Sequence, residues 1–406
     1  MTMSFHDPNR QISYLQQCLA NDKKPIAFFL GAGCPMAIRT ADNQPLIPDI
    51  AGITKAVRVK LAQSKDYAQL LTTLEANFTA DGINEPNVEF MLSHIRSLKV
   101  VAGKEKVRGL AATELDALDK GVCDFVQEVV NRSHISASSP YHCIADWINA
   151  IAREQPIEVF TTNYDLLMEQ ALESSGTPYF DGFSGVSRPF FDLQAIEEDI
   201  LPPRWARLWK LHGSINWFQA PRTGVFRSAS RPDDSAIRLI HPSHLKYDES
   251  RRMPYLVMLD RLRSFLKQPT SALIVSGYSF RDDHLNEVIL QGLQRSPSAI
   301  CFALLFGSLD QYEQAVALAN KRPNLSLLAS DGGVISGVRG SWIERAEESD
   351  LPDLGRWLKW EPKVPEKPKE GHCMRLQLGD FAAFGEFLRT LAGVRSEGIE
   401  ELTNAK

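Results

Sequence analysis

The sequence lacks the features typical of a membrane, secreted or nucleic-acid-binding protein. No apolar run approaches the ~20 residues that a transmembrane helix needs. The first residues, Met1 to Asp7, contain neither the charged nor the apolar region of a signal peptide. We therefore expect a cytoplasmic protein without a membrane anchor. The net charge of −5 gives no electrostatic reason to expect this chain alone to bind nucleic acid directly.

Cysteine is scarce, with 6 in 406 residues, and no Cys-x-x-Cys pair occurs. None lies between Cys143 and Cys301, so we expect no thiolate zinc module in that region. A disulfide framework is equally unexpected in a cytosolic chain of this size. His241 and His244 have the spacing of a metal pair, but Pro242 prevents a helix that would align them and no third ligand stands nearby. We therefore predict no metal site.

Short apolar runs separated by helical or loop segments predict an α/β fold with a Rossmann-like, doubly wound parallel sheet. Segments 180–206 and 219–235 are rich in Pro, Ser, Arg and Asp and are expected to be long loops near the site. The expected strands are Ile26–Leu30, Ile157–Thr161, Leu208–Leu211, Ile237–Ile240, Ala272–Ser276, Ala299–Phe306 and Leu325–Leu328.

Residues 52–155 show helical spacing of apolar side chains instead, for example behind Asn87, a predicted N-cap. This pattern predicts an all-helical insertion between the first two strands. The Rossmann-like domain would then comprise residues 1–51 and 156–345, and residues 346–406 would form a Pro/Lys/Glu linker and a C-terminal helix.

The C-terminal helix carries an apolar stripe, which leaves two possibilities open. In the first the stripe covers the helix's own domain, and in the second it docks on another subunit. Its side chains are Phe381, Phe384, Leu388 and Leu391.

Four polar segments each follow one of the apolar runs. In an open parallel sheet the ligand lies across the carboxyl ends of the strands, so these segments predict one shared ligand site. They are Gly31-Ala32-Gly33, Thr162-Asn163-Tyr164-Asp165, His212-Gly213-Ser214 and Gly277-Tyr278-Ser279, the last continuing to Asp282, Asp283 and His284.

The first segment suits a nucleotide phosphate. Gly31 and Gly33 after a buried strand let the backbone approach a pyrophosphate, although the third glycine of G-x-G-x-x-G is missing. The alternative is a simple tight turn. Cys34 follows at a helix start, where a lowered thiol pKa would permit redox or nucleophilic chemistry as a less favoured interpretation.

The next two segments suit catalysis. The Asn163 amide can donate and accept hydrogen bonds without carrying charge, and its alternative role is an Asx turn or N-cap. The His212 imidazole, with an ordinary pKa near 6.5, suits a general base, and its alternative is a satisfied core residue. Gly213 turns the chain and is expected to expose the imidazole at the sheet edge.

In the fourth segment Gly277 and Ser279 can donate to phosphate or ribose. Asp282 and Asp283 are expected to cap the following helix. His284 is either a ligand contact or a surface residue.

Taken in order, these motifs resemble the sirtuin family. Gly31-Ala32-Gly33, Ile47-Pro48-Asp49, Asn163-Tyr164-Asp165, His212-Gly213 and Gly277-Tyr278-Ser279 keep the sirtuin order over roughly residues 24–330. The resemblance implies NAD as substrate, with Asn163 and His212 catalytic and Asp165 contacting the nicotinamide carboxamide. It also implies NAD contacts from Gly31, Ala32, Gly33, Asp49, Thr162, Gly277, Ser279, Asp282 and His284.

The chain departs from deacylase sirtuins, which usually carry a zinc module of two Cys-x-x-Cys pairs after the His-Gly. Its helical insertion instead resembles bacterial sirtuin-like NADases of antiphage defence. The resemblance therefore implies an NAD glycohydrolase that yields nicotinamide and ADP-ribose and causes abortive infection by NAD depletion. It further implies a homo-oligomer controlled by a HerA-type hexameric ATPase. The alternatives are an NAD-dependent protein deacylase or ADP-ribosyltransferase, and a module that senses NAD or ADP-ribose without turnover.

Overall fold

The computed structural model describes residues 4–132, 139–220, 224–230, 232, 236–240, 254–343, 356–362 and 372–393. His241, Pro242 and His244 lie outside these residues, as do most of the linker and the residues after 393. Among the residues placed by the structure, no helix combines the length and the hydrophobicity needed to cross a bilayer.

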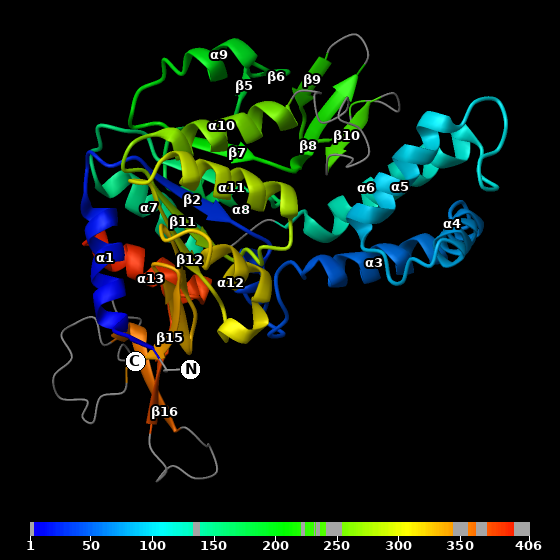
Figure 1. Ribbon diagram of the computed structural model, residues 1–406. Helices are drawn as coiled ribbons and strands as arrows, with labels where there is room; N and C mark the ends of the chain where they lie inside the picture. The colour runs from blue at the N-terminus through cyan, green and yellow to red at the C-terminus, as the bar shows by residue number, and fades with distance from the viewer. Residues whose placement is uncertain are drawn as a thin grey trace, which may run out of the picture.

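The fold is mixed α/β, built on a large sheet that is mostly parallel, as expected (Figure 1). All neighbouring pairs from β13 to β4 are parallel, whereas β14 pairs antiparallel with both β13 and β15. In sheet order the strands are β1 (Phe5–His6), β15 (Val338–Trp342), β14 (Gly332–Ile335), β13 (Leu325–Leu328), β12 (Ile300–Leu304), β11 (Ala272–Ser276), β2 (Ile26–Leu30), β3 (Glu158–Thr161), β7 (Ala206–Lys210) and β4 (Tyr179–Phe180).

The central six strands have the order of a doubly wound fold. The chain runs outward from β2 to β3 and β7, then returns to the other side of β2 and runs outward through β11, β12 and β13. The direction of winding therefore reverses between β2 and β11. Ligands of open α/β sheets bind outside the carboxyl ends of the strands at such a switch point.

Two helical layers cover the sheet, because alternate side chains of a strand point to opposite faces. On β2, Phe28 packs with α1, α7, α8 and α13, whereas Phe29 packs with α10, α11 and α12. These helices are α1 (Pro8–Ala20), α7 (Pro140–Ala150), α8 (Leu167–Ser174), α10 (Tyr255–Lys267), α11 (Asp283–Arg295), α12 (Glu313–Ala319) and α13 (Phe381–Leu391).

The apolar stripe of α13 packs on its own chain. Phe384 is fully buried, and its ring lies 6.1 Å from that of Phe28, while α13 lies against α7. Phe381, Phe384 and Leu388 of the stripe are buried and Leu391 is partly buried, which supports the first possibility, packing on the chain's own domain.

Ile237–Ile240 does form a strand, β10, but not in the main sheet. It belongs to a second, antiparallel sheet with β8 (Gly213–Ala220), β9 (Gly224–Arg227), β6 (Phe190–Phe191) and β5 (Phe183–Ser184). The expectation of long loops over 180–206 and 219–235 is thus wrong in part. Buried aromatic side chains such as Phe183 and Phe226 give these short strands a core, although the Pro and Ser content around them is typical of loops.

The helices α3 (Ile50–Gln63), α4 (Ala68–Ala80), α5 (Val88–Val101) and α6 (Ala112–Val130) pack on one another and extend to one side of the sheet (Figure 1). Asn87 caps α5 as expected. The helix α7 contacts α8 and α13 instead. We therefore propose that α3–α6 form the insertion and that α7 belongs to the layer covering the sheet.

The remaining elements are short. They are α2 (Gly33–Met36), α9 (Leu193–Glu198), the 3-10 helix Leu309–Gln311 and a hairpin of β16 (Leu358–Pro362) and β17 (His372–Leu376).

Candidate functional site

The four polar segments follow four neighbouring strands. Their order in the sheet is β11, β2, β3 and β7, all parallel. Gly277, Gly31, Asn163 and His212 therefore lie along one edge of the sheet, at or beside the switch point. This placement follows from topology, which a sequence alone does not show.

The glycines hold the two turns at the switch point together. Gly31 N donates to Ser276 O at 2.9 Å, and Gly33 N donates to Gly277 O at 2.8 Å. A Cβ on Gly31 would lie 2.4 Å from Gly277 O. Gly277 has φ +66°, which L side chains rarely adopt, and its Cβ would lie 2.5 Å from Cys34 N. The close contact between the two backbones thus requires these glycines. The sequence suggested only that they let the backbone approach a pyrophosphate.

The Asn163 side chain connects the end of β3 to the turn after β2. Its Nδ2 donates to Gly31 O at 3.1 Å, and its backbone N–H donates to Thr161 Oγ1 at 3.0 Å. Thr162 N donates to Leu30 O at 3.3 Å. Asn163 does not cap α8, because the N-cap position is Leu166. The N-cap alternative for Asn163 is therefore wrong, and its half-buried amide lies in the turn beside β2.

Asp165 lies beneath this turn rather than at its surface. It is buried, and its Oδ1 accepts from Leu167 N at 3.0 Å. Burial raises the pKa of Asp165 to about 6, although the charge of Lys210 opposes the shift. Lys210 is fully buried on β7, donates to the Asp165 carbonyl and pairs with Glu169 Oε1 at 2.9 Å. A lysine inside an apolar run gave no sign of this role in the sequence.

His212 follows β7 and is more buried than expected, with a side chain only 12% exposed. Its Nε2 lies 3.1 Å from Asp282 Oδ2, and its Nδ1 lies 3.8 Å from Glu89 Oε1. Burial by itself lowers the pKa of His212. The hydrogen bond with Asp282 and the charges of Glu89 and Asp282 outweigh burial, so the pKa is raised above 6.5.

Asp282 serves two elements at once. As the expected N-cap of α11, its Oδ1 accepts from His284 N at 3.0 Å and Leu285 N at 3.1 Å. Its Oδ2 is the oxygen facing His212. Ser279 and the His284 side chain are exposed.

Asp49 has a capping role, since its Oδ1 accepts from Gly52 N at 2.8 Å at the start of α3. Ala32 is exposed at the tip of the turn between the two glycines. Cys34 is fully buried, and burial raises the pKa of its thiol far above the usual range. The redox or nucleophilic interpretation of Cys34 is therefore wrong.

Glu89 is a residue near the site that the sequence did not reveal, and Tyr164 of the second segment was given no role there. Glu89 belongs to the helical insertion and accepts a hydrogen bond from the Tyr164 hydroxyl. In the sequence Glu89 lies in the first turn of a predicted helix. Acidic residues are common there because they interact favourably with the helix dipole, so nothing marked Glu89 as a site residue.

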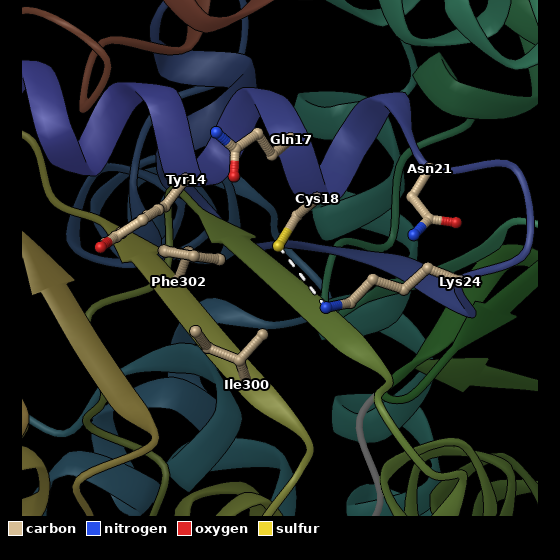
Figure 2. A pocket seen from close by; sticks show the side chains of 7 residues that line it. All are labelled: Tyr14, Gln17, Cys18, Asn21, Lys24, Ile300 and Phe302. Atoms are coloured by element: carbon tan, nitrogen blue, oxygen red, sulfur yellow. Dashed lines mark hydrogen bonds between the residues drawn. The ribbon is translucent and has the colours of Figure 1, made fainter.

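A cavity of about 340 Å³ lies elsewhere, between α1 and β12 (Figure 2). Its lining shares no residue with the strand-end segments and includes Ile300, the first residue of β12, so it opens toward the amino ends of the strands. Across it Lys24 Nζ lies 3.5 Å from Cys18 Sγ. Within the described part of the chain, no group of three or more His, Cys, Asp and Glu side chains is arranged to hold a metal ion.

A family model matches the part of the chain that carries three of the four polar segments. Residues 157–324 match the model of a SIR2-like domain, a segment that contains Asn163, His212 and Gly277. This segment is therefore similar to a SIR2-like domain, and the match spans less than half of the chain. No curated protein matches the sequence significantly.

Solved Sir2 structures are similar at low identity. One reports the mechanism and regulation of Sir2 enzymes, with 11% identity over 74% of this chain and 86% of that chain and a TM-score of 0.34. A Sir2 homologue with NAD has 14% identity over 80% and 90%, with a TM-score of 0.34. A mutant Sir2 homologue with ADP-ribose has 15% identity over 74% and 87%, with a TM-score of 0.35. Residue roles in this chain are therefore inferred from its own geometry.

Proposed function

We propose that this protein is an NAD glycohydrolase, which cleaves NAD with water to give nicotinamide and ADP-ribose. The observation that supports it best is an amide and an imidazole, Asn163 and His212, at the ends of the adjacent parallel strands β3 and β7 in the SIR2-like segment. The chemistry of NAD suits this pair.

Nicotinamide in NAD is a cationic leaving group, so bond cleavage needs no acid to protonate it. Catalysis then depends on orienting the ribose and stabilising the positive charge that develops on it. The uncharged Asn163 amide can hold a ribose hydroxyl or water next to this cation without competing charge. Its donation to Gly31 O fixes the amide in place, so little reorganisation is needed on binding.

His212 is the proposed base. An ionised carboxylate only accepts hydrogen bonds, so the contact with Asp282 Oδ2 assigns the ring proton to Nε2. The lone pair of the neutral ring is then on Nδ1, where it can accept a proton from a ribose hydroxyl or from water. In other catalytic histidines, too, one ring nitrogen is hydrogen bonded to a carboxylate while the other nitrogen takes the proton.

The glycine turns after β2 and β11 are the proposed seat of the pyrophosphate, because they lie at the switch point of the sheet. The carboxylate of Asp282 already occupies the N-terminus of α11 and would repel a phosphate there. We therefore place the phosphates toward Ala32 and Gly33, with Thr162 and Ser279 as further contacts. Asp49, Asp165 and His284 would act by supporting neighbouring turns.

Hydrolysis is preferred to acyl transfer because no cysteine stands between Cys143 and Cys301, whereas deacylase sirtuins usually carry their zinc module after the His-Gly. We extend the proposal to NAD depletion in antiphage defence, in a homo-oligomer controlled by a HerA-type ATPase. This context depends on the resemblance of the motifs and of the helical insertion.

Mass spectrometry of NAD incubated with the protein, with and without an acetylated peptide, tests the reaction. We expect nicotinamide and ADP-ribose in equal amounts whether or not peptide is present. Deacetylation of the peptide with no ADP-ribose formed in its absence would contradict hydrolysis, and binding without any product would favour the sensing alternative.

Single substitutions at the two proposed catalytic residues supply the control. We expect Asn163→Ala and His212→Ala each to lower kcat by roughly 10²-fold or more, with a smaller effect on KM. Circular dichroism should show a folded chain, since both residues end strands outside the apolar core. Near-normal turnover in either variant would remove that residue from the mechanism.

A further inference from the structure

The helical insertion reaches the candidate catalytic centre at the first turn of α5. Asn87 caps this helix, and Val88 N donates to Thr54 Oγ1 of α3 at 2.9 Å. Glu89 follows, with a side chain 25% exposed. The start of α5 is thus held by two side-chain hydrogen bonds within the insertion while Glu89 faces the sheet.

Glu89 contacts two residues of the strand-end segments with one oxygen. Its Oε1 accepts a hydrogen bond from the hydroxyl of Tyr164, which lies between Asn163 and Asp165. The same oxygen lies 3.8 Å from Nδ1 of His212. The imidazole is therefore flanked by Asp282 at Nε2 and by Glu89 at Nδ1.

We propose that Glu89 is a positioning residue for His212, which holds the imidazole against Asp282, favours its protonated form after proton transfer and couples the insertion to catalysis. This inference depends on the proposed role of His212 as a base. In this proposal Glu89 takes no proton and forms no bond to the substrate; it acts on the imidazole from 3.8 Å, beside Nδ1.

Among the residues that the structure describes, charged and titratable groups approach His212 from α5, from the start of α11 and from the turn after β3. They are Glu89 from α5, Asp282 from the start of α11, and Tyr164 from the turn after β3, whose hydroxyl shares Glu89 Oε1. Both carboxylates raise the pKa of His212. Removing the charge of Glu89 should therefore lower the pKa of His212. The contact with Asp282 would still hold the proton of the neutral ring on Nε2.

Arg96 lies two turns after Glu89 on the same face of α5 and ties the helix to other elements. Arg96 Nε pairs with Asp119 of α6 at 3.0 Å, and its Nη1 donates to Ile240 O of β10 at 3.1 Å. Arg238 of β10 donates to Gln127 of α6 at 2.8 Å. The insertion is therefore joined to the second sheet by the partly buried Arg96 and the buried Arg238, and a shift of α5 against that sheet would move Glu89 relative to His212.

The test uses two variants at Glu89 and one control in the full chain. Glu89→Gln keeps the size and an acceptor for Tyr164 but loses the charge, and Glu89→Asp keeps the charge. Glu128→Gln removes an equivalent charge from α6, where Glu128 is exposed and pairs with Lys60. Unfolding curves establish that all three variants are folded.

The first measurement is the titration of His212 in the free protein by NMR of labelled histidine, with His212→Asn assigning its signal among nine histidines. We expect Glu89→Gln to lower the titration midpoint by about one pH unit, as expected for a charge near 4 Å in a partly buried site. Glu89→Asp should keep most of the raised midpoint, and Glu128→Gln should match the wild type.

The second measurement is the pH profile of NAD consumption. Its acidic limb should move to lower pH in Glu89→Gln by the same amount as the NMR midpoint, with a lower plateau rate. An unchanged midpoint in Glu89→Gln, or an equal change in Glu128→Gln, would overturn the positioning role. If no variant and no wild type consumed NAD while the midpoint still moved, the proposed function would fail and the positioning of His212 would stand.

Discussion

His212 shows how a single residue takes its properties from distant parts of the chain. Its ring lies between carboxylates from α5 and from the start of α11, which are far from it in sequence. Burial alone would keep the imidazole neutral, but these two neighbours reverse the direction of the pKa shift. The consequence is a measurable dependence of activity on pH.

We predict that NAD turnover is lost as the pH falls through the pKa of His212, because only the neutral ring accepts a proton. Since this pKa is raised, the half-maximal rate should lie above pH 6.5, with a plateau on the alkaline side. Initial rates of NAD loss from about pH 5.5 to 9 measure it. A rate that is flat over this range, or that rises as the pH falls, would argue against His212 as the base.

The turns after β2 and β11 behave as one element. Their backbones are hydrogen bonded to each other, and both depend on glycine where a Cβ would meet a carbonyl or an amide. Neither neighbour is a flexible side chain, so the turns cannot adjust to a larger residue without moving apart.

We predict that Gly31→Ala destabilises the protein by about 2–3 kcal/mol or more. The new Cβ would lie 2.4 Å from Gly277 O and 2.7 Å from the Tyr278 Cα. Gly103→Ala is the matched control, because a Cβ there meets no atom within 4 Å, and it should change stability by no more than about 0.5 kcal/mol. Urea unfolding compares the two. Equal free energies of unfolding for Gly31→Ala and Gly103→Ala would contradict the prediction, because the turns would then accommodate the new Cβ without strain.

In the molecule as a whole, α13 completes the helical layer over one face of the sheet. The rings of Phe28 and Trp147 lie 5.4 Å apart, and Phe384 of α13 packs on the same Phe28. The C-terminal helix is thus a structural part of the Rossmann-like domain.

We predict that the full-length protein forms a homo-oligomer and that Phe384→Ala keeps its size while lowering stability by about 3–5 kcal/mol. Phe306→Ala is the control, because Phe306 is 66% exposed and should matter little. Light scattering at micromolar concentration and thermal unfolding measure the two effects. If Phe384→Ala dissociated the oligomer without lowering the stability, α13 would dock on another subunit after all. A monomeric wild type would contradict the predicted homo-oligomer.

The ATPase partner is a separate question. A pull-down with a HerA-type ATPase, or its presence as a neighbouring gene, would support it, and finding neither would leave only the proposed NADase.

Local pattern was enough to locate the main elements. Ile26–Leu30, Ala272–Ser276 and Leu325–Leu328 are strands with the expected bounds, because apolar runs buried on both faces need nothing from the rest of the chain to be recognised. Asn87 capped its helix for the same local reason. Polar residues after such strands predicted that Asn163 and His212 follow strand ends, whereas the adjacency of those two strands comes from the sheet topology.

Contacts between distant segments could not be predicted in this way. The second sheet, the buried stripe of α13, the contact between Gly31 and Gly277, and the approach of Glu89 to His212 each join residues far apart in sequence. Periodicity and propensity describe neighbours along the chain, whereas these contacts arise when the sheet brings strand ends together. The candidate catalytic residues were therefore visible in the sequence, while the environment that sets their chemistry belongs to the folded molecule.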